Sequence, residues 1–159
     1  MRLYFFRHGL AHTPDDPTFP DHLRALTDEG IIRTRRAARV LRMLDLDPER
    51  LYSSPLVRAR QTADILGQTL GVAVQVRDEL APGFNMGALE ALTHDLGTDD
   101  EVLLVGHEPD FSEMVAELTD GCHVEMKKGG LARVDVDSYH PLRGSLIWLI
   151  APKIFDQLG

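Results

Sequence analysis

The chain has 159 residues, the size of one ordinary globular domain, and its 43% hydrophobic and 26% charged residues exclude wholesale disorder. It contains no apolar run of about 18 residues that could span a membrane, and its N-terminal apolar run is too short for a signal peptide. One cysteine, Cys122, excludes a disulfide framework, and the net charge of −8 argues against binding to nucleic acid. We therefore expect a single cytoplasmic domain over residues 1–159, with neither a membrane nor a nucleic-acid partner.

The first half of the chain predicts two strands, each followed by a helix. In chain order, we expect a strand over 3–6, a loop rich in Pro and Asp over 13–21, a helix after the N-cap Thr27, a strand over 50–54 and a helix from Pro55 to Leu70 that ends at Gly71. The apolar face of the first helix consists of Ala37, Val40, Leu41 and Leu44. Strands that alternate with helices are typical of a parallel sheet.

The second half continues this alternation and ends in two adjacent strands. In chain order, we expect a strand over 72–76, a helix over 87–96, a strand over 101–105, a helix over 111–118 and strands over 131–137 and 145–150, joined by a loop that contains Pro and Gly. We therefore predict an α/β fold, a three-layer α/β/α sandwich around a mostly parallel central sheet. Sheets of this kind bind ligands beyond the carboxyl ends of their strands.

Three predicted strands end in side chains suited to a phosphoryl group. The first ends at Arg7-His8-Gly9, where the arginine offers a planar set of donors and the glycine lets the backbone approach a ligand closely. The second leads to Arg58 in the first turn of a helix, where free N–H groups favour an anion. The strand over 101–105 leads to His107, and two histidines from neighbouring strands suggest a nucleophile and a proton donor. Each segment alone also fits a solvated turn, so the prediction depends on their convergence.

Taken together, these segments resemble the histidine phosphatase superfamily, which includes cofactor-dependent phosphoglycerate mutases and acid phosphatases. The similar motifs are Arg-His-Gly at 7–9, Ser-Pro-Leu-Val-Arg-Ala-Arg-Gln-Thr-Ala at 54–63 and Gly-His at 106–107, in the family's order. The resemblance extends from Arg2 to about Leu118 and selects Arg58 over Arg60. The short length and the segment over 24–30 look most like SixA-type phosphohistidine phosphatases. This resemblance implies a phosphoglycerate mutase-like fold without a lid insertion.

The resemblance also implies a phosphatase that needs neither a metal ion nor a cofactor. His8 would attack phosphorus and become a phosphohistidine intermediate, which water would later hydrolyse. Arg7, Arg58 and His107 would surround the phosphoryl oxygens, and Gly9 would lie against the substrate. The neighbouring arginines would disfavour the imidazolium form of His8 and so lower its pKa.

Two glutamates compete for the role of general acid. In relatives that resemble acid phosphatases an acidic residue follows the second histidine, and Glu108 matches that position. In mutase-like relatives a glutamate follows the third strand, where Glu79 stands. Either could instead be a charge at the end of a helix or loop, and a phosphoramidate needs a general acid less, because imidazole leaves more easily than an alkoxide. From the sequence, the general acid is Glu108, Glu79 or neither of them.

The expected substrate class follows from the short connection before the strand at 101–105. Only 22 residues separate Glu79 from Val102, too few for the lid that encloses small substrates in larger relatives. An open site fits a phosphorylated protein, such as a phosphotransfer domain that carries phosphohistidine. The alternatives are a broad phosphomonoesterase for small phosphorylated metabolites and, in another class, a non-catalytic phosphate-binding or interaction domain.

Two groups of basic residues are expected to be solvated surface rather than part of the site. One is the turn at 127–130, which contains two lysines and two glycines. The other is the set of arginines on the first helix, which spread around the helix instead of forming one stripe: Arg33, Arg35, Arg36, Arg39 and Arg42. A docking surface on this helix is the less favoured interpretation.

Overall fold

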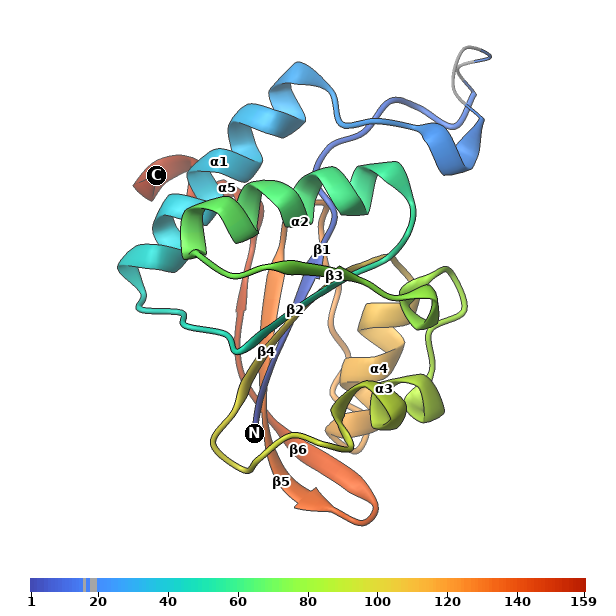
Figure 1. Cartoon of the computed structure of the whole chain (residues 1–159), viewed down its shortest axis with the longest axis vertical. Helices are drawn as coiled ribbons and strands as arrows, with labels where there is room; N and C mark the ends of the chain where they lie inside the picture. The colour runs from blue at the N-terminus through green and yellow to red at the C-terminus, as the bar shows by residue number, and fades with distance from the viewer. Residues whose placement is uncertain (16, 18–19) are drawn as a thin grey trace.

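The computed structural model describes residues 1–15, 17 and 20–159, and at its centre is a six-stranded sheet. The strands are β1 (Arg2–Arg7), β2 (Arg50–Ser53), β3 (Val74–Val76), β4 (Glu101–Gly106), β5 (Leu131–Tyr139) and β6 (Leu142–Ile150). Their order is β3-β2-β4-β1-β5-β6; the first four are parallel, and β5 runs antiparallel to both β1 and β6 (Figure 1). The predicted mostly parallel sheet is confirmed.

Helices cover both faces of this sheet. α1 (Asp28–Met43), α2 (Val57–Leu70) and α5 (Pro152–Leu158) lie on one face, and α3 (Met86–Thr93) and α4 (Asp110–Leu118) lie on the other (Figure 1). Two short 3-10 helices, η1 (Asp21–Leu23) and η2 (Asp78–Leu80), lie in the connections. Between η2 and β4 the chain forms α3 and turns but no larger lid. The expected three-layer α/β/α sandwich is confirmed.

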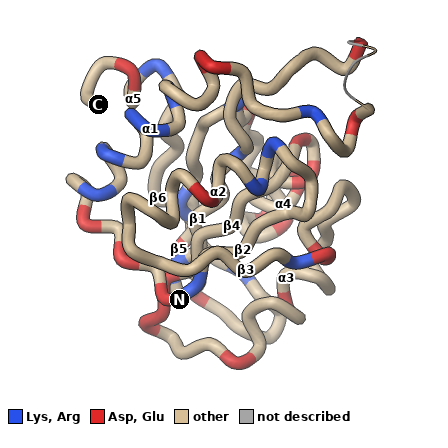
Figure 2. Tube along the Cα trace, turned by 45° about the horizontal axis from the view of Figure 1, so that its top comes forward, with Lys and Arg blue, Asp and Glu red and all other residues tan. Residues whose placement is uncertain are grey.

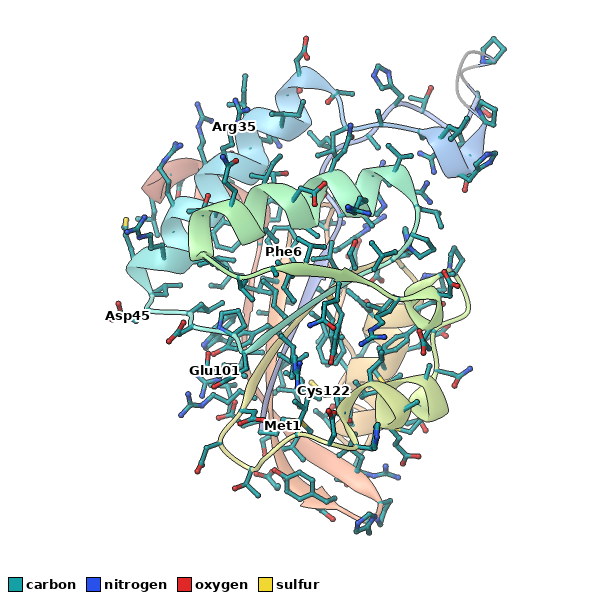
Figure 3. All side chains as sticks on the ribbon, in the orientation of Figure 1. Met1, Phe6, Arg35, Asp45, Glu101 and Cys122 are labelled. Atoms are coloured by element: carbon teal, nitrogen blue, oxygen red, sulfur yellow. The ribbon has the colours of Figure 1, made fainter. Side chains whose placement is uncertain are left out.

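β1 contributes to the hydrophobic core on both faces of the sheet, because its successive side chains point in opposite directions. Phe5 packs against Phe111 of α4 on one face, with ring centroids 5.3 Å apart. Phe6 packs against Phe155 of α5 on the other face, with centroids 6.4 Å apart, and lies between the sheet and the helices in Figure 3. Both phenylalanines of the strand are fully buried, as expected for a central strand covered on both sides.

Local signals in the sequence explain where two helices begin or end. Thr27 caps α1, since its hydroxyl accepts a hydrogen bond from the N–H of Gly30 at 3.0 Å. Gly71 ends α2 in the left-handed region, at φ 79°, which glycine adopts without strain. Leu44 requires a correction, because it follows the last residue of α1 and is 50% exposed instead of lying on the buried face.

Several element boundaries differ from the predictions. α2 begins at Val57 rather than at Pro55, β3 does not include Val72, and α3 ends at Thr93 rather than at residue 96. α5 is not predicted from the sequence, because its seven residues are too few for a helical period to be recognised. Residues 16, 18 and 19 of the expected Pro- and Asp-rich loop lie outside the described part of the chain.

The two C-terminal strands form a longer hairpin than expected. β5 and β6 have nine residues each, and only His140 and Pro141 join them. Gly144, expected in the loop, is paired with Val136 inside the hairpin. A register shift near this pair lets the hairpin bend. Within the described ranges, no helix is both long and apolar enough to cross a membrane.

The arginines of α1 divide into two kinds. Arg33 and Arg36 are partly buried and lie 3.6 Å and 3.7 Å from carboxylate oxygens of Asp156 in α5. Arg35 is exposed and points away from the fold (Figure 3), as part of the basic positions along α1 in Figure 2. The expected solvated surface therefore also helps to hold α5 against α1.

The carboxyl ends of β1, β4 and β2 meet at one edge of the sheet. Arg7, the last residue of β1, is paired with Gly106 at the end of β4. Ser53, the last residue of β2, is paired with Val105. The segments that follow these strands therefore leave the sheet side by side, together with the N-terminus of α2.

Candidate active site

A hollow of about 290 Å³ lies at this edge of the sheet. The predicted site residues that line it are Arg7, His8, Arg58, His107 and Glu108. Two further cationic residues, Arg24 and Lys128, also line it, although the sequence analysis does not assign either to the site. The structure therefore brings the three predicted strand ends together, with four cationic side chains and two histidines around one hollow.

Gly9 supports the backbone beside His8 and does not line this hollow. Its N–H donates to Oγ1 of Thr62 at 3.1 Å, and its carbonyl oxygen lies 2.8 Å from Nδ1 of His8. A Cβ atom at this position would lie 2.6 Å from Oγ1 of Thr34, so α1 packs this closely only against a glycine. The structure thus shows close packing at Gly9, and its contact with a ligand stays a prediction.

The imidazole of His8 is buried and neutral, and one nitrogen is available as an acceptor. A carbonyl oxygen only accepts hydrogen bonds, so the contact with Gly9 assigns the ring proton to Nδ1 and leaves the lone pair on Nε2. The Nε–H of Arg58 donates to this Nε2 at 3.3 Å. Burial, reinforced by the nearby His107 and the two arginines Arg58 and Arg7, lowers the pKa of His8 to about 3.

Arg58 is placed by α2 and by the segment that contains η1. It is the second residue of the helix, is 5% exposed, and donates from Nη1 to the carbonyl oxygen of Asp21 at 2.8 Å. Its Nη2 lies 3.5 Å from the Asp21 carboxylate. Arg60 is exposed instead and pairs with Asp64 on the same helix at 3.2 Å. The choice of Arg58 over Arg60 therefore agrees with the positions of the two side chains.

Arg7 is anchored at one end of its guanidinium group. Its Nη1 donates to the carbonyl oxygen of Met126 at 2.7 Å. Its Nε is buried and has no hydrogen-bond partner among the residues that the structure describes. A buried N–H without a partner is costly in a folded protein, and an anionic ligand in the hollow would satisfy it.

His107 is oriented by Ser54, which follows β2. Nε2 of His107 lies 2.7 Å from Oγ of Ser54, and the ring centroid lies 5.3 Å from that of His8. Oγ of Ser54 also accepts from the N–H of Leu56 at 3.3 Å, so its own proton is free to be donated to Nε2. The ring proton of His107 then sits on Nδ1, which is buried without a partner among the described residues. Burial lowers the pKa of His107 to about 4, so the ring is neutral.

The structure separates the two candidate general acids. Glu108 lines the hollow, and its carboxylate accepts hydrogen bonds from the N–H and hydroxyl groups of Ser112 in α4. Glu79 is exposed on η2 and lines a different hollow, together with Arg77 and Arg50. Of the two glutamates, only Glu108 lies at the site with His8.

Arg24 and Lys128 are site residues that sequence reasoning missed. Arg24 is 7% exposed and donates to Oδ1 of Asp21 at 2.7 Å and 3.0 Å, so Asp21 lies between Arg24 and Arg58. Lys128 lies in the turn that was expected to be solvated, and this expectation is wrong for Lys128, which is half-buried. One signal in the sequence points to Lys128. Its turn directly precedes the strand that begins at Leu131, and a prediction that this strand pairs with β1 would have placed the turn at the edge of the sheet.

The described part of the chain contains no group of three or more His, Cys, Asp or Glu side chains arranged to hold a metal ion. The charges around His8 come instead from arginine and lysine side chains. This donor set suits an anionic ligand, because guanidinium and ammonium groups are donors without acceptor capacity.

Known proteins resemble this chain in both sequence and structure. Phosphohistidine phosphatase SixA of Escherichia coli is 29% identical over 157 residues, which cover 96% of this chain and 94% of that protein. An uncharacterized protein of Picosynechococcus is 42% identical over 137 residues, 82% of each chain. The structure of SixA complexed with tungstate superposes with a TM-score of 0.84 at 29% identity and covers 97% of this chain and 99% of that one.

Other solved structures share the fold at lower identity. A mycobacterial glucosyl-3-phosphoglycerate phosphatase has a TM-score of 0.73 at 19% identity, covering 92% of this chain and 96% of that one. The family profile described as histidine phosphatase superfamily (branch 1) matches residues 3–121, which include all three motifs at the sheet edge. The chain therefore belongs to the histidine phosphatase superfamily, a family of phosphatases, in its branch 1.

Proposed function

We propose that residues 1–159 form one histidine phosphatase domain that hydrolyses phosphohistidine in a protein through a phospho-His8 intermediate. The observation that carries this proposal is the state of His8. Its Nε2 holds a lone pair, its pKa is lowered to about 3, and an arginine N–H lies 3.3 Å away. A nucleophilic imidazole must be unprotonated, and this one stays neutral at neutral pH.

The reaction needs two displacements at phosphorus. Nε2 of His8 attacks phosphorus, the bond from phosphorus to the leaving nitrogen or oxygen breaks, and the leaving group takes a proton from the carboxyl group of Glu108. A water molecule then attacks phospho-His8 and gives a proton back to the Glu108 carboxylate, the P–N bond breaks, and inorganic phosphate leaves while the electron pair returns to Nε2. The sum is hydrolysis by one water molecule, and His8 is regenerated.

Arg7, Arg58 and His107 are suited to stabilise the transferring group. Arg58 points its Nε–H at Nε2 of His8. Arg7 has a buried Nε–H and His107 a buried Nδ1–H, and neither has a partner among the residues that the structure describes. These donors come from three segments that line one hollow with His8, in which the phosphoryl group would lie. Preorganised donors of this kind stabilise the charge that develops on the phosphoryl oxygens.

Glu108 is the candidate proton donor on the leaving-group side, because it alone of the two glutamates lines the hollow. The carboxylate also accepts hydrogen bonds from the N–H and hydroxyl groups of Ser112, which fix its position. A phosphoramidate depends less on such a donor than a phosphomonoester does, because imidazole leaves more easily than an alkoxide.

The shape of the site supports a protein substrate. The connection that could carry a lid holds only α3, and the hollow opens at the end of the sheet. The similarity to a protein named phosphohistidine phosphatase agrees with this substrate. The second candidate substrate is a small phosphomonoester. The fold that this chain shares with a glucosyl-3-phosphoglycerate phosphatase supports this alternative.

The substrate proposal is tested by comparing kcat/KM for a phosphotransfer protein that carries phosphohistidine with kcat/KM for a panel of sugar phosphates and an aryl phosphate. We expect the phosphoprotein to exceed every monoester by at least about 100-fold. A preference for any monoester would identify the small-molecule phosphatase instead. Phosphate binding without turnover of either class would identify the non-catalytic alternative.

A further inference from the structure

The turn that carries Lys128 is attached to the backbone on either side of His8. The N–H of Gly129 donates to the carbonyl oxygens of both Arg7 and His8 at 3.0 Å each. The N–H of Arg7 donates in return to the carbonyl oxygen of Gly130 at 3.0 Å. Three backbone hydrogen bonds therefore fix the Cα of Lys128 relative to the residue proposed as the nucleophile.

The side chain of Lys128 lines the hollow beside cations. It is half-buried and shares the hollow with three arginines, Arg7, Arg24 and Arg58, and with the carboxylates of Glu108 and Asp110. Burial, with the charges of these three arginines, lowers the pKa of Lys128. A cation among cations is unfavourable unless an anion joins them.

The ammonium group of Lys128 differs from the other cations in having no partner among the residues that the structure describes. Across residues 1–15, 17 and 20–159, no hydrogen bond or ion pair involves Nζ of Lys128. Arg24 and Arg58 share the Asp21 carboxylate, and Arg7 donates to a backbone carbonyl. Among the described residues, Lys128 is thus the cation of the hollow whose donors are all unused.

The neighbouring lysine shows what a solvated residue of this turn looks like. Lys127 is exposed and pairs with the carboxylate of Glu125, which is also exposed. It does not line the hollow. The two adjacent lysines therefore have the same chemistry but different surroundings, and they form a matched pair for an experiment.

We propose that Lys128 is a substrate-binding residue whose ammonium group donates to an oxygen of the phosphoryl group held against His8. This inference rests on the proposed function, because it takes His8 as the position of phosphorus. A lysine suits the place, since its flexible stem and three donors can follow an oxygen as the group moves toward and away from His8. With Arg7 and Arg58 it would provide three charges around a phosphoryl dianion.

The test compares the variants Lys128→Met and Lys127→Met with the wild type. The dissociation constant of inorganic phosphate and of tungstate is measured by calorimetry, and kcat/KM is measured on the phosphohistidine protein. We expect Lys128→Met to raise the dissociation constant of both oxyanions by about tenfold, the effect of losing one charge-assisted hydrogen bond. Lys127→Met should bind them within about twofold of the wild type, and Lys128→Arg should recover most of the affinity.

The outcomes separate this inference from the proposed function. If the wild type binds neither oxyanion, the proposed function itself fails. If the wild type binds the oxyanions and Lys128→Met binds them equally well, only the role of Lys128 is contradicted. This also holds if Lys128→Met lowers kcat/KM on the phosphohistidine protein while its affinity for the oxyanions is unchanged. Since Nζ of Lys128 has no partner in the described part of the chain, Lys128→Met should melt no lower than the wild type. Lys128→Gln is measured beside it, so that the test stays decisive if the methionine variant does not fold.

Discussion

The Nε–H of Arg58 donates to Nε2 of His8 at 3.3 Å across 50 residues of sequence. A donor at this nitrogen requires that the nitrogen carry a lone pair, so the contact itself describes a neutral imidazole. The two residues meet because β1 and β2, with β4 between them, end at one edge of a parallel sheet. Burial keeps this nitrogen unprotonated, and the charge that would hold a phosphoryl group reinforces the effect.

Replacing Arg58 by alanine is expected to lower kcat/KM by a factor of about 100 to 1,000, because it removes a buried donor aimed at the phosphoryl position. The matched control is Arg60→Ala on the same helix, which removes an exposed ion pair and should leave kcat/KM within about twofold. Steady-state kinetics of the two variants decide the point. Equal losses in both variants would contradict the placement of Arg58.

Replacing Ser54 by alanine tests how the proton of His107 is placed. The variant removes the hydroxyl 2.7 Å from Nε2 of His107 and frees the ring to change tautomer. We expect kcat to fall about tenfold while the melting temperature changes little. Ser54→Thr, which restores a hydroxyl, should recover part of the rate. Wild-type kcat in the alanine variant would show that His107 does not depend on this hydrogen bond.

The leaving-group role of Glu108 can be separated from that of Glu79 by two conservative variants. Glu108→Gln should reduce hydrolysis of an alkyl phosphate at least about 100-fold, the lower end of the range for a general acid. The same variant should reduce hydrolysis of phosphohistidine less than about threefold, because imidazole leaves readily. Glu79→Gln should change neither rate. A loss on both substrates with Glu79→Gln alone would reverse the assignment.

Stability is expected to fall as the pH is lowered from about 6.5. His8 and His107 have ordinary pKa values of 6.5 that the fold lowers to about 3 and about 4. Between pH 6.5 and the lowered pKa of each histidine, the unfolded chain binds a proton that the folded chain does not, so acid favours unfolding. Each such histidine costs up to about 1.4 kcal/mol per pH unit.

This dependence is measured by denaturant unfolding at several values between pH 6.5 and 4.5. His107→Gln should have a shallower slope than the wild type, by one proton taken up on unfolding. Identical slopes would mean that His107 is not buried in its neutral form. His123→Gln, at a residue outside the hollow, serves as the control.

The residues of the site that sequence reasoning identified are those next to strands and helices with clear signals. Arg7 and His8 directly follow an apolar run, and a parallel sheet brings such ends together whatever the details of the loops. The family motif distinguishes Arg58 from Arg60, and the structure shows the physical reason. The two side chains are two positions apart on one helix, so they point in different directions.

The missed residues depend on tertiary contacts that leave no periodic pattern. Lys127 and Lys128 are adjacent and chemically identical, and only the hydrogen bonds of Gly129 to the end of β1 determine which one faces the hollow. Arg24 is placed by its pairing with Asp21, in a connection without a hydrophobic period. Leu44 was misassigned for a similar reason, because its apolar side chain fits the helical period although α1 has already ended.

The most direct test of the account is the identification of the residue that becomes phosphorylated during turnover. The wild type and His8→Ala are mixed with the phosphohistidine protein, stopped within milliseconds in alkaline detergent, which preserves phosphohistidine, and analysed by peptide mass spectrometry. We predict a phosphoryl group on His8 of the wild type and neither label nor turnover in His8→Ala. Turnover retained by His8→Ala, or a phosphoryl group on a different residue of the wild type, would contradict the mechanism.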